Sequence, residues 1–305
     1  MASKLMSLLS SKERILAEKI LEAHHALKIE QRDTDQHIVL TSEDTIYRIV
    51  KVACFELGFI QQDAELIAKA WSKQSSKSSF DPEKWPGDLQ DFDRHPNRLS
   101  PFANCPQQLG LYVVAPTAEW VAKLAQAGVK TIQLRFKSSS EELIYEEVQA
   151  AVKSVQGYPC HLFINDHWQA AIKYKAYGVH LGQEDLSSAD FDVIASAGLR
   201  LGISTHGYAE MLRAIAYHPS YIALGAIFPT TLKAMETAPQ GIGRLRQYAK
   251  LLKDYSLVGI GGVDASNMRE VIDCQVGSVA VVRAVIQAQD YASAIAQLQS
   301  YFVSN

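Results

Sequence analysis

Residues 161–186 read HLFINDHWQAAIKYKAYGVHLGQEDL and contain one complete strand–helix–strand unit. The apolar run at 161–164 ends in the polar triplet Asn165-Asp166-His167, and residues 168–173 follow with the spacing of a short helix. A second apolar run at 178–180 again ends in polar residues. A strand, a polar end, a helix and another strand, in that order, predict parallel strands joined by a crossover helix.

The same alternation extends on both sides of this unit. Short apolar runs typical of strands occur at 109–114, 131–134, 161–164, 178–180, 201–203, 221–224, 257–260 and 278–281. Helical spacing fills intervals at 118–127, 141–155, 168–173, 208–217 and 242–252. Eight βα units in the 197 residues from 109 to 305 favour a compact α/β protein of the (β/α)8 TIM-barrel class. A doubly wound open sheet normally has only about five or six strands.

The first 108 residues differ from the rest in composition. Only two of the 17 glycines, Gly58 and Gly87, lie before residue 109, and five of the ten prolines lie between 82 and 106. Helical spacing occurs at 11–29, 42–57 and 63–72, and Thr41 or Ser42 is expected to cap the second of these helices. We therefore expect an N-terminal helical extension: a small helical module at 1–74 and a proline-rich linker at 75–108. The barrel then occupies 109–305.

Overall charge excludes some classes of partner. The net charge is −3, from 30 Lys and Arg against 33 Asp and Glu, so the chain lacks the basic excess that nucleic acid or an anionic membrane would attract. Four widely spaced cysteines are typical of free thiols in a reducing cytosol. No run approaches the ~18 apolar residues of a membrane span, and the first residues make a poor signal peptide. We expect a cytoplasmic protein that acts on small molecules. These features are compatible with a homo-oligomer.

Cationic side chains follow the second predicted strand. Alternation along Gln133-Leu134-Arg135-Phe136-Lys137 sends Gln133, Arg135 and Lys137 to one face. Two cations and an amide that point together into a barrel mouth are costly to bury without an anion, which favours a polyphosphate ligand. The alternative is a pair of solvated surface cations.

Carboxylates follow the third and fourth predicted strands. Asp166 and Asp185 lie at neighbouring strand ends, where they could share one Mg²⁺ with water and substrate phosphate oxygens. Each Asp also precedes a helical stretch, so a role as helix N-cap is the alternative. Asn165 and Ser204 end their strands in the same way. His180, also at a strand end, fits either a supporting role beside the metal or the core.

The last three strands end in residues suited to a phosphate. The loop after the sixth strand carries Thr230, Thr231 and Lys233, and could close over a substrate or simply connect two elements. Gly262 follows the seventh strand, and Val282 and Arg283 follow the eighth. Glycine after strand seven with helix N–H groups after strand eight is a common barrel site for a phosphomonoester.

Taken in order, these motifs resemble the thiamine-phosphate synthase family from 109 to about 286. The resemblance rests on IQLRFK (132–137), FINDHW (163–168), YGVHLGQEDL (177–186), LGISTH (201–206), PSYIALGAIFPTT (219–231), GIGG (259–262) and GSVAVV (277–282). It implies a (β/α)8 barrel that joins 4-amino-2-methyl-5-(diphosphooxymethyl)pyrimidine to a thiazole phosphate. The products are thiamine phosphate and pyrophosphate, and the cofactor is Mg²⁺.

Carried over by motif, the resemblance also implies roles for single residues. The pyrimidine diphosphate would be held by Gln133, Arg135, Lys137, Asn165, Ser204 and Lys233. Among these, the catalytic groups would be Arg135, Lys137, Ser204 and Lys233. The metal would be held by Asp166 and Asp185. The thiazole phosphate would be held by Thr230, Thr231, Gly262, Val282 and Arg283.

Two positions depart from the family pattern. The loop usually reads TxTK, and Leu232 replaces its second threonine; Arg283 stands where a small residue such as serine is usual. Both changes concern the thiazole phosphate, while the expected metal and pyrophosphate groups are all present. We therefore expect synthase activity to be retained.

Two other functions remain as alternatives. A related barrel, thiazole tautomerase, would not require the diphosphate groups at Arg135, Lys137 and Lys233 or the two aspartates. A non-catalytic protein of the pathway could use the helical module to bind a partner. Residues 59–74 faintly resemble the C-terminal end of hydroxymethylpyrimidine phosphate kinase, but the segment is too short for a kinase. The adjacent His24 and His25 are expected on a helix surface rather than at a metal.

Overall fold

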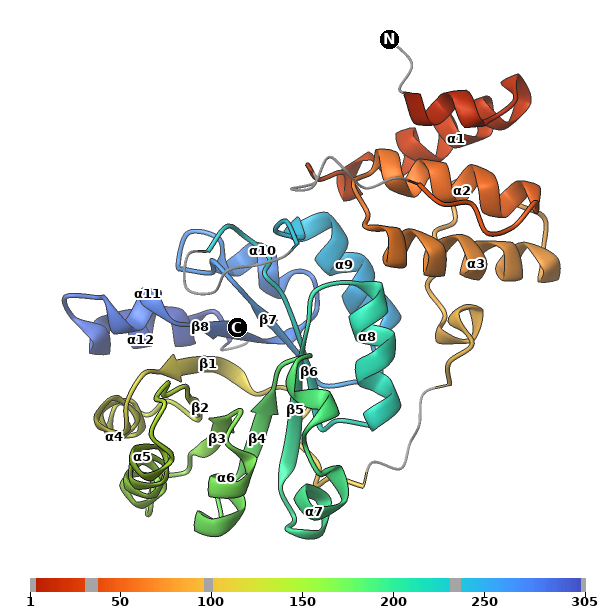
Figure 1. The fold of residues 1–305 in the computed structure, drawn as a ribbon. Coiled ribbons are helices and arrows are strands. Elements are labelled where there is room, and N and C mark those ends of the chain that lie inside the picture. Colours follow the sequence, from red (N-terminus) through yellow and green to blue (C-terminus); the bar gives the residue numbers. More distant parts are fainter. Residues whose placement is uncertain (1–3, 31–37, 96–100, 231–236, 303–305) are drawn as a thin grey trace.

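A closed eight-stranded barrel forms the larger part of the molecule (Figure 1). The computed structural model describes residues 4–30, 38–95, 101–230 and 237–302. All neighbouring strands are parallel, and β1 pairs with both β2 and β8, which closes the ring. The strands are β1 (Gly110–Ala115), β2 (Thr131–Leu134), β3 (His161–Asn165), β4 (Gly178–Leu181), β5 (Arg200–Thr205), β6 (Tyr221–Leu224), β7 (Leu257–Ile260) and β8 (Gly277–Val281). This confirms the predicted (β/α)8 class.

Helices surround the ring and connect each strand to the next. They are α4 (Ala118–Gln126), α5 (Glu141–Ser154), α6 (Trp168–Tyr174), α7 (Phe191–Ser196), α8 (Tyr208–Ala214), α9 (Gly241–Leu251), α10 (Met268–Ile272), α11 (Arg283–Ile286) and α12 (Tyr291–Ser300). Two short 3-10 turns, η4 (Asp185–Ser187) and η5 (Ile215–Tyr217), adjoin α7 and α8. Side-chain caps fix several starts: Ser140 accepts from the N–H of Leu143 before α5.

Strand alternation divides the apolar residues between two cores. In β1, Tyr112 and Val114 face the barrel interior, whereas Leu111 and Val113 pack against the helices. Large aromatic rings fit in the interior because glycines on neighbouring strands leave room for them. A Cβ on Gly202 would lie 2.1 Å from the ring of Tyr221. The barrel centre is therefore packed, and chemistry is confined to its rim.

Three helices precede the barrel and pack on one another. They are α1 (Ser11–Ala23), α2 (Thr45–Glu56) and α3 (Gln61–Lys77), with 3-10 turns η1 (Lys4–Leu8) and η2 (His25–Leu27). Because α3 ends at Lys77, three residues past the predicted boundary, the helical module from here on means the described residues 4–30 and 38–77. Ser10 and Glu13 form a capping box at the start of α1. The cap of α2 is Asp44, which accepts from Tyr47 N–H, and the predicted cap at Thr41 or Ser42 is wrong. Thr41 instead bonds the hydroxyl of Tyr47 and a carboxylate of α3.

One predicted surface histidine lies inside this module. His24 is 8% exposed, its Nε2 lies 3.0 Å from the carbonyl oxygen of Pro82, and its ring meets Trp71 and Trp85 edge-on. The prediction of a surface position is wrong for His24, because residues distant in sequence cover it. His25 is exposed, as predicted.

The described parts of the proline-rich segment, residues 78–95 and 101–108, contact the barrel. The segment contains a 3-10 turn, η3 (Leu89–Phe92), and buries Trp85 and Phe92. The indole N–H of Trp85 donates to the hydroxyl of Tyr208 at 2.8 Å, and Phe92 stacks on the same tyrosine ring. Ser256 then donates to the carbonyl of Pro106 at 3.1 Å, just before β1. Side chains of this segment therefore bind the barrel at several points.

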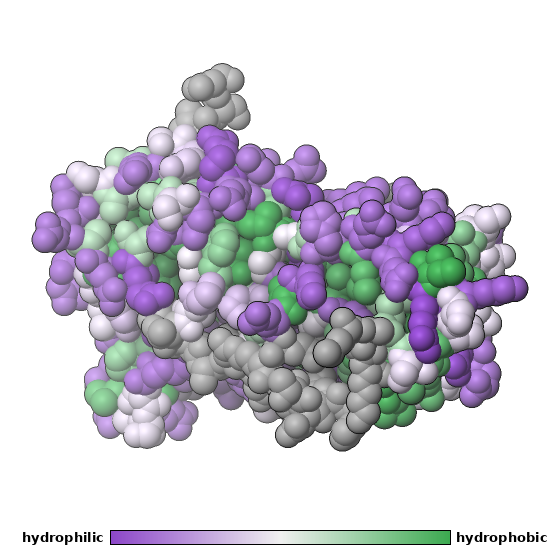
Figure 2. Space-filling view, turned by 90° about the horizontal axis from the view of Figure 1, so that it is seen from above, coloured by the Kyte–Doolittle hydropathy of each residue, from purple (hydrophilic) through white to green (hydrophobic). Residues whose placement is uncertain are grey.

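On the face shown in Figure 2, hydrophobic residues form separate small areas among hydrophilic ones. Within the described ranges, no helix has both the length and the apolar character needed to cross a bilayer.

Candidate active site

Polar residues gather where β2 to β5 end. Gln133 and Asn165 are 4% and 7% exposed at the ends of β2 and β3, and Ser204 is half-buried near the end of β5. Asn165 is the register partner of His180 on β4. Parallel strands bring their carboxyl ends to one rim, so these predicted residues share one mouth.

Cations and carboxylates meet just above these strand ends. Lys137 is exposed and its ammonium group contacts a carboxylate oxygen of Asp166. Arg135 is half-buried at the end of β2, where its N–H donates to Ala115 at 2.8 Å. The lysine thus lies beside Asp166, one of the two predicted metal ligands.

Asp166 and Asp185 form a repelling pair. Partial burial, and then the negative charge of Asp166, raises the pKa of Asp185 above its ordinary value. One oxygen of Asp185 accepts from the N–H of Gly182 at 2.8 Å, which fixes the carboxylate within its own turn. A divalent cation would relieve this repulsion, so the pair fits Mg²⁺. No cluster of three or more His, Cys, Asp or Glu suited to a metal occurs among the described residues, so substrate oxygens or water would complete the shell.

The alternative role of these aspartates as helix caps is not supported by the structure. The N-cap of α6 is His167, and the N-cap of α7 is Asp190. Asp166 instead has φ 62°, a left-handed backbone that Asp tolerates better than most residues.

A chain of buried hydrogen bonds links two predicted substrate residues across the barrel. Ser204 Oγ lies 2.8 Å from His180 Nε2, and His180 Nδ1 lies 2.6 Å from the hydroxyl of Tyr221. That hydroxyl lies 2.9 Å from the hydroxyl of Tyr112, which accepts from the amide of Gln133 at 2.9 Å. Burial raises the pKa of both tyrosines, which keeps the phenols protonated. His180 therefore positions Ser204 rather than simply filling the core.

Sequence reasoning missed the two tyrosines of this chain. Both lie in apolar runs that were interpreted only as strands, Tyr112 on β1 and Tyr221 on β6. The alternation of side chains along a strand could have revealed them. Each tyrosine occupies a position that faces the barrel interior, and a buried phenol hydroxyl needs a hydrogen-bond partner.

The remaining arc of the mouth is formed after β6, β7 and β8. Phe228 N–H donates to Gly261 at 2.9 Å, so the loops after β6 and β7 lie side by side. Gly262 has φ 69°, and a Cβ there would lie 2.7 Å from the Cβ of Phe228. Thr230 is half-buried on the first of these loops. Val282 caps α11, and Arg283 is its first residue. Thr231, Leu232 and Lys233 lie outside the described residues.

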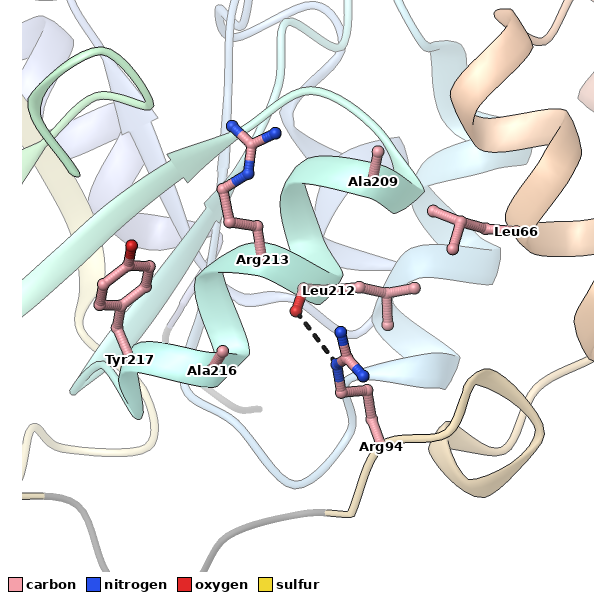
Figure 3. Close-up of a pocket in the computed structure, with 7 residues that line it drawn as sticks. All are labelled: Leu66, Arg94, Ala209, Leu212, Arg213, Ala216 and Tyr217. Carbon is pink, nitrogen blue, oxygen red and sulfur yellow. Dashed lines mark hydrogen bonds between the residues drawn. The ribbon is translucent and has the colours of Figure 1, made fainter. Parts of the chain in front are cut away.

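A groove of about 420 Å³ lies away from this mouth, on the outer side of α8 (Figure 3). Leu66 of α3 and Arg94 face α8 across it, and Arg94 Nε donates to Leu212 O at 3.5 Å. The side chains of Arg94 and Arg213 extend from different parts of the groove and do not converge (Figure 3). None of the predicted site residues lines it.

Comparison with known proteins identifies the barrel. A family model described as thiamine monophosphate synthase matches residues 108–285. The chain belongs to the thiamine monophosphate synthase family. A thiamine-phosphate synthase of Serratia proteamaculans is 52% identical over 199 residues, which cover 65% of this chain and 94% of that protein. A thiamine-phosphate synthase of Neisseria meningitidis serogroup A is 50% identical over 192 residues. These residues cover 63% of this chain and 94% of that protein.

A solved structure of the same kind agrees with the fold. The thiamine phosphate pyrophosphorylase from Pyrococcus furiosus matches with a TM-score of 0.57 and 29% identity, covering 64% of this chain and 95% of that one. The family match begins at residue 108, so the helical module lies outside it. Thiamine monophosphate synthase chemistry is therefore assigned to the barrel.

Proposed function

We propose that the chain condenses 4-amino-2-methyl-5-(diphosphooxymethyl)pyrimidine with thiazole phosphate to form thiamine phosphate and pyrophosphate. The observation that carries this proposal is the contact of Lys137 with Asp166 beside Asp185, on a barrel about half identical to thiamine-phosphate synthases. A cation and two carboxylates at one mouth suit a diphosphate bound with Mg²⁺. The tautomerase reaction uses no diphosphate and would not need this cluster of charged groups.

The chemistry needs stabilisation of charge and alignment rather than a protein nucleophile. The CH₂–O bond of the pyrimidine breaks, and its electron pair leaves with pyrophosphate. The 4-amino ring donates electron density to the cation that forms, and the lone pair of the thiazole nitrogen makes the new C–N bond. The protein contributes by holding both reactants in line and by stabilising the departing diphosphate.

The diphosphate would be bound by side chains from β2 to β5. Arg135 and Lys137 supply positive charge, and Lys137 moves from Asp166 to a phosphate oxygen. Ser204 donates its hydroxyl proton to the diphosphate while Nε2 of His180 fixes the hydroxyl in place. Gln133, Asn165 and Lys233 complete this proposed set.

Asp166 and Asp185 would hold Mg²⁺. The bound ion supplies positive charge that neutralises diphosphate oxygens as they leave. In the protein alone, Lys137 supplies part of this charge by contacting Asp166. Burial, and then repulsion from Asp166, raises the pKa of Asp185, and a bound cation would offset both effects.

The thiazole phosphate would bind on the arc from β6 to β8. Its proposed contacts are Thr230, Thr231, Gly262, Val282 and Arg283. Support comes from the close approach of the loops after β6 and β7, which Gly261 and Gly262 permit. The two substrates then meet over the barrel centre. We place the reaction in the cytoplasm, with small molecules as the only substrates.

A two-substrate assay tests the function. Purified full-length protein with both substrates and Mg²⁺ is expected to release pyrophosphate and thiamine phosphate in equal amounts. Omission of either substrate or chelation of the metal should stop the release. Absence of pyrophosphate with both substrates present would contradict the proposal, and proton exchange on the thiazole alone would favour the tautomerase.

A further inference from the structure

A buried arginine of the barrel binds the helical module. Arg244, on α9, is 2% exposed; its Nε donates to Leu27 O at 3.0 Å and its Nη2 to Leu57 O at 2.9 Å. Its guanidinium carbon lies 3.6 Å from the ring centroid of Phe59. Nη1 donates to the side chain of Gln240 at 3.1 Å. One side chain therefore joins two backbone carbonyls of the module to the start of α9.

Gln240 is the last residue of the loop that follows β6. Its N–H donates to Ala226 O at 2.9 Å, which ties the end of this loop to its beginning. Its side-chain oxygen accepts from both Arg244 and the hydroxyl of Tyr248, at 3.1 and 2.8 Å. Because this loop carries Thr230, the contacts of Arg244 set where a proposed substrate loop ends.

A second bond between the two parts reaches α8, the helix after β5. Asp63, on α3, is 3% exposed, and its Oδ1 accepts from the N–H of Ala209 at 2.9 Å, in the first turn of α8. That turn begins four residues after Ser204. The module thus supplies an acceptor that α8 does not provide for itself, since Gly207 precedes the helix without a side-chain cap.

Two glycines of the barrel allow the helical module to approach this closely. A Cβ on Gly243, in α9, would lie 1.9 Å from Ala26 O, and a Cβ on Gly207 would lie 2.3 Å from Asp63 Oδ2. In Figure 1, the module stands beside α8 and α9, the helices that carry these contacts. Both helices follow strands whose ends bear proposed substrate residues.

We propose that the helical module is a positioning element of the synthase, which through Arg244 and Asp63 fixes the described ends of the loop after β6 and the first turn of α8, and thereby positions Thr230 and Ser204. The inference rests on the proposed function of the barrel. Arg244 and Asp63 touch no substrate and act as positioning residues. Misplaced loops weaken substrate contacts, so the effect is on KM as well as kcat.

Three variants of the full chain test the inference. Arg244→Lys keeps a positive charge but cannot span two module carbonyls and Gln240 at once. Gly243→Ala pushes a methyl group against Ala26 O without altering any polar group. Both should raise KM for at least one substrate about fivefold or more, at a temperature where each variant is folded. Gly87→Ala is the matched control, because its Cβ would make an ordinary 3.5 Å contact with Lys250; its KM should stay within about twofold.

A purely structural role predicts a different pattern. If Arg244→Lys and Gly243→Ala lower kcat only in proportion to the folded fraction and leave both KM values unchanged, the inference is wrong. Failure of the unaltered chain to release pyrophosphate would count against the proposed function instead.

Amide exchange in the unaltered chain keeps the inference testable if the variants fail to fold. Thiamine phosphate and pyrophosphate with Mg²⁺ should slow exchange in residues 24–29 and 56–63 as well as in the barrel loops, because coupling is reciprocal. Protection of the barrel loops without any change in these module segments would overturn it.

Discussion

Asp166 combines an unusual backbone with a charged environment. Its φ of 62° places the residue in the left-handed region, and its carboxylate contacts Lys137 and repels the carboxylate of Asp185. The sequence predicted its function from one polar triplet after an apolar run. It could not predict the backbone conformation, which depends on the bond from Asp166 N–H to His180 O at 2.9 Å on the next strand.

The charge of Asp166 can be removed without changing its shape. Asp166→Asn keeps a residue that tolerates the left-handed region, so the fold should be preserved within about 1 kcal/mol. It loses the negative charge that pairs with Lys137 and the proposed metal, so kcat/KM should fall about 100-fold or more. Pyrophosphate release and thermal unfolding measure the two quantities. Equal losses in activity and stability would point to a structural role.

Single residues also show where sequence reasoning stops. Gln133, Asn165, Asp166 and Ser204 could be placed because each lies at or next to the end of a strand, and strand ends in a barrel share a rim. Tyr112 escaped notice because its role depends on partners 21 and 109 positions away, which no local pattern links to it.

At the scale of elements, strand and helix periodicity was sufficient for the barrel. β2, β6 and β7 have the predicted bounds, and β5 is longer at both ends because it pairs along its length with β4 and β6. The contacts between α3 and α8 were not foreseen. A buried Asp on one helix that caps another helix gives no periodic signal in either sequence.

The bond from α3 to α8 should make stability depend on pH. Burial raises the pKa of Asp63 from 3.8 to about 6, although the N–H of Ala209 and then the charge of Arg244 oppose the rise. The folded chain therefore binds this proton more tightly than the unfolded chain. The resulting stabilisation is complete below about pH 4 and is lost as the pH rises through 6.

Comparison with Asp63→Asn isolates this effect, since the amide does not titrate. The free energy of unfolding of the parent, minus that of the variant, should fall by up to about 3 kcal/mol between pH 4 and pH 7. Urea unfolding across that range measures the difference. A constant difference, or one that grows with pH, would contradict the raised pKa.

At the scale of the whole molecule, the glycine and proline distribution indicated two kinds of structure but not how they meet. Composition identified a helical part before residue 109, and the structure shows helices there. Their attachment depends on Arg244, Phe59 and Asp63, which come from distant parts of the chain and carry no joint motif. Relatives matched only over the barrel offer no guide to this interface.

Removal of residues 1–105 should damage the barrel rather than merely shorten the chain. The truncation leaves Arg244 without two carbonyl partners and removes Phe59, Trp85 and Phe92 from the buried ring of Tyr208. Hydrogen bonds to a charged group contribute about 1.5–3 kcal/mol each, so a loss of at least about 3 kcal/mol is expected. Calorimetry and turnover of the truncated chain measure it. Unchanged unfolding temperature and turnover would show that the barrel is independent.

The bond from Trp85 to Tyr208 also provides an intrinsic optical reporter of this interface. Trp85 is 5% exposed where the proline-rich segment meets the barrel, and it stacks on Phe59 of the module. An indole in such a dry environment emits at short wavelength, and water shifts its emission to the red. Comparison of the unlabelled chain with a Trp85→Phe variant isolates the emission of Trp85 from that of Trp71, Trp120 and Trp168, so exposure of this interface to water can be followed by fluorescence.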